Sequence, residues 1–315
     1  MTTALDDPGR PEAADDAIRS PRAEAAAAAE SVGKTFGQTV ALQDCTLTVP
    51  RGAVVGLVGR NGAGKSTLLR TLVGLVAADA GQATLLGEDS RTLSPEAKSR
   101  LGYVPQQSDL PGWMTPRQAW AYFGAFQPYW DAEHVADLAR RFAVPEDSRI
   151  GSLSGGQRQI ATVIASLGHW PDVLLLDEPV ASLDPRARRQ FLSLLQELAE
   201  RHEEVDRPLT VLLSSHITAD LERAASHIAV MRDGQVTLME ELASLQDGVV
   251  RLRITASDPL PQPPLRSLAL HHHGRTVVAV VPGDLTVHWE RWAAEHHATA
   301  LTDAINLEDL FVELA

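Results

Sequence analysis

The chain has 315 residues, of which 44% are hydrophobic and 22% charged, so it is large enough for one sizeable globular domain and a smaller one. Its formal net charge of −13 argues against general nucleic-acid binding, which needs clustered Lys and Arg to neutralise phosphates. The lone cysteine, Cys45, excludes an intrachain disulfide framework, and we interpret it as a small buried apolar residue.

The N-terminal segment does not have the features of a signal peptide. Residues 1–28 are rich in Ala, Asp, Glu and Pro, so we expect a disordered acidic tail in which the alanine run 25–29 forms at most a nascent helix. A signal peptide has a basic and then an apolar region, and this segment has neither. No stretch reaches the roughly 18 apolar residues that a membrane-spanning helix needs. The sequence therefore predicts a protein that stays in the cytoplasm.

Strand and helix patterns alternate over residues 29–246, which predicts an α/β domain with a mainly parallel sheet. Continuous apolar runs, typical of strands covered on both faces, occur at 53–58, 173–176 and 211–213. From about 107 to 160 the pattern turns helical and aromatic, which indicates a helical subdomain inserted into the sheet domain. The dipeptide Asp233-Gly234 between two apolar runs predicts a hairpin that closes the domain.

Residues 247–315 are predicted to form a small α+β accessory domain that regulates or stabilises the first. Its expected elements are strands near 250–254 and 276–281, a helix with Trp289 and Trp292, and a final amphipathic helix near 307–314 capped by Asn306. Three consecutive histidines, 271–273, cannot converge on one metal ion from a regular element. We therefore expect them, and the pair 296–297, in solvated loops.

A phosphate-binding loop is the strongest chemical signal. Residues 59–67, Gly-Arg-Asn-Gly-Ala-Gly-Lys-Ser-Thr, fit the pattern G-x-x-x-x-G-K-[ST] between a predicted strand and a predicted helix. Glycines let the loop turn its amide groups inward, and the start of the helix adds positive potential. Lys65 is placed to reach the β- and γ-phosphates, and the Ser66 hydroxyl to ligate Mg²⁺. We predict an ATP site, with Mg²⁺, formed by Gly59, Asn61, Gly62, Gly64, Lys65, Ser66 and Thr67.

Two acids follow the apolar run 173–176. Asp177 is placed to hold Mg²⁺ through water, and Glu178 to polarise the water that attacks the γ-phosphate. Strands often end in polar residues, so this pair points to catalysis only in combination with the phosphate loop.

The motifs over about residues 31–245 resemble, in their order, those of ABC (ATP-binding cassette) ATPases. Leu153-Ser154-Gly155-Gly156-Gln157 matches the signature sequence, which other P-loop families lack. By the same resemblance Gln106 looks like the Q-loop glutamine that ligates Mg²⁺, and His216 like the switch histidine that contacts the γ-phosphate. Asp184 in the segment Ala-Ser-Leu-Asp-Pro resembles the D-loop aspartate.

Phe36 falls where this family usually places a tyrosine that stacks on adenine. Phenylalanine keeps the ring, so stacking should survive, and the alternative is that Phe36 is a core residue.

The resemblance implies a P-loop fold with a parallel core, an antiparallel N-terminal β part and a helical subdomain. It also implies a dimer, because in the family Ser154, Gly155, Gly156 and Gln157 of one chain contact the nucleotide of the other. Two cassettes then enclose two ATP molecules, and hydrolysis releases them. The partner is a second ATPase subunit, identical or different.

Within this family we expect a transporter subunit, held at the cytoplasmic face of the cell membrane by a separate integral membrane permease. Segments 305–311 and 127–131 are similar to parts of bacterial drug- or antibiotic-type exporter subunits, which favours export. An importer subunit and a soluble cluster-assembly ATPase remain alternatives. The apolar segment 108–114, with Trp113, is expected to be a socket for a permease helix, unless Trp113 merely packs the helical subdomain.

Overall fold

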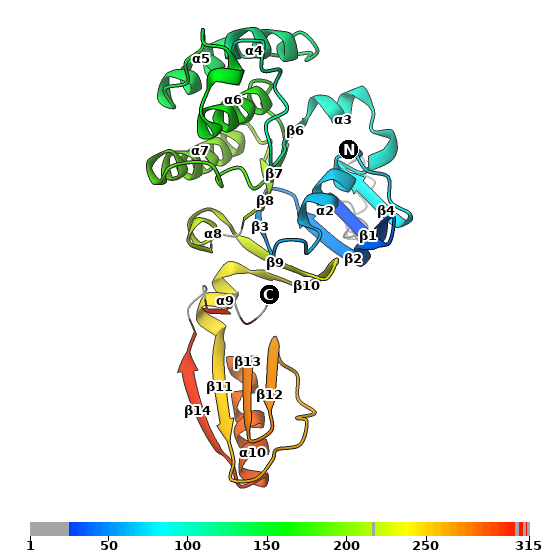
Figure 1. Ribbon diagram of the computed structural model, residues 1–315, viewed down its shortest axis with the longest axis vertical. Helices are drawn as coiled ribbons and strands as arrows, with labels where there is room; N and C mark the ends of the chain where they lie inside the picture. Colours follow the sequence, from blue (N-terminus) through cyan, green and yellow to red (C-terminus); the bar gives the residue numbers. More distant parts are fainter. Residues whose placement is uncertain (1–24, 216–217, 306–308, 311–312, 314–315) are drawn as a thin grey trace, which may run out of the picture.

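The computed structural model describes residues 25–215, 218–305, 309, 310 and 313 (Figure 1). These residues form three sheets. Helices α4–α7 lie at one end of the molecule in Figure 1, the C-terminal sheet lies at the other, and the two remaining sheets lie between them. None of the described helices is long and apolar enough to cross a lipid bilayer.

The N-terminal sheet is antiparallel, with strand order β2-β1-β4-β5. Its strands are β1 (Ala25–Phe36), β2 (Thr39–Pro50), β4 (Ala80–Leu85) and β5 (Glu88–Asp89). Cys45 is buried in β2, and burial raises the pKa of its thiol to about 11, in keeping with a small apolar residue.

The start of β1 corrects the predicted tail. The predicted disordered tail includes residues 25–28, but these belong to a strand that pairs with β2 and β4. Ala26 to Ala29 are at most 5% exposed, and Ala26, Ala27 and Ala29 share an apolar cluster with the leucines of α2 (Lys65–Leu72). Strand pairing and burial outweigh the helix preference of alanine here, because that preference is a weak local term. The rest of the predicted tail, residues 1–24, lies outside the described residues.

The central sheet has strand order β10-β9-β3-β8-β7-β6. Its strands are β3 (Val54–Val58), β6 (Leu101–Val104), β7 (Val173–Asp177), β8 (Thr210–Ser214), β9 (His227–Arg232) and β10 (Gln235–Glu241). All neighbours are parallel except β9 and β10, which form the hairpin predicted from Asp233-Gly234. The carboxyl ends of β3, β7 and β8 therefore meet at one edge, which positions the loops that follow them.

The helical insert lies between β6 and β7 in the sequence. It contains α4 (Pro116–Gly124), α5 (Ala132–Arg141), η2 (Ile150–Ser152) and α6 (Gly155–Leu167). Trp120 anchors α4 on α6, since it is 3% exposed and its Nε1 donates a 2.9 Å hydrogen bond to the carbonyl of Ala161. The other helices that precede the C-terminal sheet in the sequence are η1 (Ser90–Thr92), α3 (Pro95–Ser99), α7 (Pro185–Glu204), α8 (Thr218–Ala224) and α9 (Leu242–Gly248).

The C-terminal sheet is antiparallel, with order β12-β13-β11-β14. Its elements are β11 (Val249–Thr255), β12 (Ala269–His273), β13 (Thr276–Pro282), η3 (Gly283–Leu285), α10 (Thr286–Glu295) and β14 (Thr299–Ala304). Trp289 and Trp292 of α10 are buried against this sheet. Val249, Val280 and Leu310 join an apolar cluster that also contains Leu242 and Leu245, so the two domains share packing.

The histidines at 271–273 are in β12, which corrects the predicted loop. They pair with β13, where His271 lies opposite Val278 and His272 opposite Val277. His271 lies 2.8 Å from a carboxylate oxygen of Glu313. Within the described part of the chain, no group of three His, Cys, Asp or Glu side chains is arranged to hold a metal ion. Most of the predicted final helix, including Asn306, Leu307 and Phe311, lies outside the described residues.

Candidate nucleotide site

The phosphate loop joins the end of β3 to the start of α2. Gly62 and Gly64 have φ angles of 86° and 107°, in the left-handed region that strains any residue with a Cβ. At Gly64 a Cβ would also lie 2.5 Å from the carbonyl oxygen of Ala41. The fold therefore requires glycine at position 64, and the loop keeps its wrapped shape.

Lys65 and the amides of the first turn of α2 face this loop. No side chain caps the start of α2, so its first amide groups are available to an anion. Lys65 is 7% exposed, and its Nζ donates hydrogen bonds of 2.7 Å and 3.3 Å to the carbonyls of Gly59 and Arg60. A buried ammonium beside uncapped amides supplies the donors that bind phosphates.

The two acids at the end of β7 are held by one serine of β8. Ser214 Oγ donates a 2.9 Å hydrogen bond to Asp177 Oδ1 and accepts a 2.8 Å bond from the backbone N–H of Glu178. Glu178 has a φ of 49°, the left-handed conformation that non-glycine residues seldom adopt. Such strained backbone at a site is typical of residues whose placement matters for function.

Asp177 fits the role of a cation ligand. Its side chain is fully buried, and Oδ2 has no hydrogen-bond partner within the described structure. A buried carboxylate oxygen without a partner is costly, and a divalent cation or its water would satisfy it. Ser66, the second residue of α2, supplies a hydroxyl of the kind that ligates Mg²⁺ after a phosphate loop.

Lys65, at the start of α2, and Glu178, directly after β7, lie close together although they are far apart in the sequence. Lys65 Nζ lies 3.8 Å from Glu178 Oε1, and both side chains are almost completely buried. The structure thus places the cation predicted to bind phosphates next to the carboxylate predicted to orient the attacking water.

Gln106 and His216 complete the predicted catalytic set. Gln106 is exposed and follows β6, which ends at Val104 beside Leu176 of β7. It lines a groove whose other wall includes Gly155 and Ser182. His216 lies just after β8 and outside the described residues.

The signature residues form the exposed start of α6. Ser154 and Gln157 make a capping box, in which Ser154 Oγ accepts a 3.2 Å bond from the backbone N–H of Gln157 and Gln157 Oε1 accepts a 3.0 Å bond from that of Ser154. Gly156 packs against the segment before α7, where a Cβ would lie 2.9 Å from the carbonyl oxygen of Ser182. The signature and the D-loop segment are therefore in contact within one chain.

Asp184 is the N-cap of α7. Its carboxylate accepts hydrogen bonds of 3.0 Å from the N–H of Ala187 and 2.8 Å from that of Arg186, and these bonds lower its pKa. Asp184 therefore stays charged and fixes the geometry of the D-loop segment.

Phe36 and Trp113 are both exposed. The Phe36 ring, at the end of β1, is 50% exposed and lies 5.3 Å from Lys34 Nζ. The exposure excludes the alternative that Phe36 is a core residue.

Trp113 is 69% exposed, so the alternative in which it packs the helical subdomain is wrong. Its neighbours Leu110 and Met114 do pack there, beside Ala119, Ile150 and Leu153.

Ser214 is the site residue that the sequence did not single out. Ser214 and Ser215 directly follow the apolar run 211–213. A polar residue at the end of a buried strand was the signal that could have identified Ser214 as a site residue. Only the pairing of β7 with β8, which sets Asp177 opposite Ser214, reveals its contacts.

Known proteins resemble this chain in sequence and in structure. The family model described as ABC transporter matches residues 42–181. Nod factor export ATP-binding protein I of Burkholderia orbicola (strain AU 1054) is 30% identical over 302 residues, which cover 90% of this chain and 95% of that protein. The daunorubicin/doxorubicin resistance ATP-binding protein DrrA of Streptomyces peucetius is 34% identical over 230 residues, or 70% of this chain and 68% of that protein.

Two solved structures show the same fold. The ATP binding subunit of an ABC transporter has a TM-score of 0.63 at 24% identity, covering 70% of this chain and 91% of that one. A dimeric post-hydrolysis state of the ATP-binding cassette MJ0796, bound to ADP and Pi, has a TM-score of 0.60 at 21% identity, covering 69% of this chain and 98% of that one.

Proposed function

The chain belongs to the ABC transporter family of ATP-binding proteins, and from this membership we propose that it is the ATP-hydrolysing subunit of an exporter. It would work as a dimer on the cytoplasmic face of the membrane, bound to a separate integral membrane subunit. The single observation that carries export is the similarity to a Nod factor export ATP-binding protein over 90% of the chain, a share too large for the cassette alone.

In the proposed reaction the phosphates lie on the amides of the phosphate loop and of the first turn of α2. Lys65 turns from the carbonyls of Gly59 and Arg60 to the β- and γ-phosphates, where its charge balances the charge of the transition state. Glu178 Oε1, 3.8 Å from Lys65 Nζ, orients a water toward the γ-phosphorus. Phe36 offers its exposed ring to adenine.

Bound Mg²⁺ would neutralise charge on the phosphate oxygens, and the residues that would hold it are Ser66, Gln106 and Asp177. Asp177 suits this role because Oδ2 lacks a partner while Ser214 fixes Oδ1. The hydroxyl of Ser214 thus keeps the carboxylate in one orientation.

The signature residues complete the site of the second chain. The exposed start of α6 has uncapped amides in Gly155 and Gly156 beside the Ser154 hydroxyl, which suits a γ-phosphate on a facing molecule. Two ATP molecules would then hold two chains together, and hydrolysis would release them. The exposed Trp113 beside the Gln106 groove is proposed to contact the membrane subunit.

The test is Glu178→Gln, with the exposed Glu200→Gln as its control. The first variant should bind MgATP but lose at least about two orders of magnitude in turnover. In size-exclusion chromatography it should elute as a dimer with MgATP and as a monomer with MgADP. The control should hydrolyse ATP normally. A Glu178→Gln chain that keeps near-normal turnover would contradict the assigned role.

A further inference from the structure

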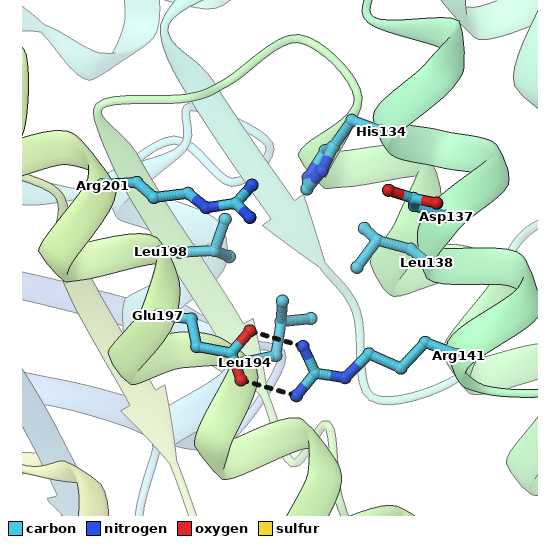
Figure 2. A pocket seen from close by; sticks show the side chains of 8 residues that line it. All are labelled: His134, Asp137, Leu138, Arg141, Leu194, Glu197, Leu198 and Arg201. Atoms are coloured by element: carbon cyan, nitrogen blue, oxygen red, sulfur yellow. Dashed lines mark hydrogen bonds and ion pairs between the residues drawn. The ribbon is translucent and has the colours of Figure 1, made fainter.

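A cavity outside the nucleotide site lies between α5 and α7. It has a volume of about 260 Å³ and is lined by His134, Asp137, Leu138 and Arg141 of α5 and by Leu194, Glu197, Leu198 and Arg201 of α7 (Figure 2). Drug-sized pockets hold roughly 300–1,000 Å³, so this cavity suits a smaller molecule.

One end of the cavity holds a buried ring nitrogen without a hydrogen-bond partner. His134 is 9% exposed, and its Nε2 has no hydrogen-bond partner within the described structure. The ring stacks on Trp170 at a centroid distance of 4.5 Å, which fixes its plane. Burial lowers the pKa of His134, so at neutral pH the ring is uncharged and offers one N–H. An unsatisfied buried polar atom of this kind calls for a ligand or a water.

Arg201 faces His134 across that end, as Figure 2 shows. Among the described residues it forms no ion pair within 4 Å, although its guanidinium lies 6.0 Å from the Trp170 ring. The acids of the cavity are already engaged, because Glu197 holds Arg141 through bonds of 2.6 Å and 2.8 Å and Asp137 pairs with Arg140. Among the described residues, no carboxylate is therefore in direct contact with the guanidinium of Arg201.

The middle of the cavity is apolar. Leu138, Leu194 and Leu198 are at most 3% exposed as residues and lie between the His134–Arg201 end and the Arg141–Glu197 pair (Figure 2). A ligand that uses both parts needs an anionic head for His134 and Arg201 and a short apolar body for the leucines.

We propose that this cavity binds a small organic carboxylate, with its carboxylate between His134 Nε2 and Arg201 and its hydrocarbon chain along Leu138, Leu194 and Leu198. One unpaired cation and one neutral donor match a monoanion better than a phosphate dianion, which needs more donors. A bound carboxylate would bridge α5 of the helical insert and α7, the helix that Asp184 caps.

The test measures binding of hexanoate to the full-length protein by saturation-transfer NMR and by melting temperature. Hexan-1-ol, hexylamine and inorganic phosphate are the comparison probes. We expect hexanoate to bind best, and Arg201→Gln and His134→Phe each to weaken it about tenfold or more, since each removes a hydrogen bond to a charged group. The control Arg291→Gln, an exposed arginine of α10, should bind as the wild type does.

Arg201 is on the surface, so its substitution tests the site even if His134→Phe folds poorly. The proposal is overturned if hexan-1-ol or phosphate binds as tightly as hexanoate, if hexanoate does not bind at millimolar concentration, or if Arg201→Gln leaves its affinity unchanged.

Discussion

Ser214 and Asp177 lie on neighbouring strands and share a 2.9 Å hydrogen bond inside the central sheet. The same hydroxyl accepts the backbone N–H of Glu178, the residue whose left-handed φ starts the turn after β7. One serine therefore orients the proposed Mg²⁺ ligand and supports the strained residue that carries the proposed catalytic carboxylate.

Ser214→Ala should remove both bonds. We expect unfolding to require about 1–3 kcal/mol less, because the buried N–H of Glu178 loses its acceptor. Turnover should fall about tenfold, and half-maximal activity should need more Mg²⁺, because Asp177 is free to rotate. Steady-state ATPase assays across a Mg²⁺ titration measure this. Ser166→Ala, which removes only a bond within α6, is the control and should leave the Mg²⁺ curve in place. An unshifted curve for Ser214→Ala would refute the orienting role.

Trp113 and Trp120 form a matched pair in the helical insert, at 69% and 3% exposure. Trp113→Ala should leave soluble ATPase activity and melting temperature nearly unchanged while weakening assembly with the membrane subunit. Trp120→Ala should cost about 3–5 kcal/mol of stability, since it leaves a cavity and removes the hydrogen bond to the carbonyl of Ala161. Calorimetry and co-purification of the two subunits in detergent separate these effects. A large drop in melting temperature for Trp113→Ala with intact assembly would rule out the docking role.

A chain that ends at Gln246 should still bind MgATP with similar affinity, because the nucleotide motifs lie upstream. It should melt several degrees lower, because Leu242 and Leu245 lose Val249, Val280 and Leu310 from their apolar cluster. Nucleotide titration and thermal unfolding of both chain lengths provide the comparison. If the shortened chain is folded by circular dichroism yet fails to bind nucleotide, the C-terminal domain takes part in the site.

Much of the cassette was predictable because its signals are local. Buried strands appear as continuous apolar runs, and the phosphate loop has fixed glycine spacing before its helix. The strand formed by the alanines at the start of β1 was not predicted, because no local sequence pattern indicates that β2 and β4 will pair with them. The extended conformation of the histidines of β12 was not predicted for the same reason, since it depends on their pairing with β13.

In the candidate site, too, local signals predicted some residues and tertiary contacts determined others. Lys65 and Asp177 follow from motif chemistry, whereas the bond from Ser214 depends on the register of β7 against β8. The cavity at His134 needs two helices to meet that are far apart in sequence. Contacts of this kind are set by tertiary packing, which spacing along the chain does not encode.

The central claim is that the signature of one chain completes the nucleotide site of another. Lys65→Ala and Ser154→Arg chains should each be nearly inactive alone. Mixed in equal amounts they should regain about a quarter of wild-type ATPase activity, because about half of the dimers are mixed and each has one intact site of two. The activity of the mixture should also fall steeply on dilution. No recovery on mixing, or full-rate hydrolysis by a diluted wild-type monomer, would contradict the shared site.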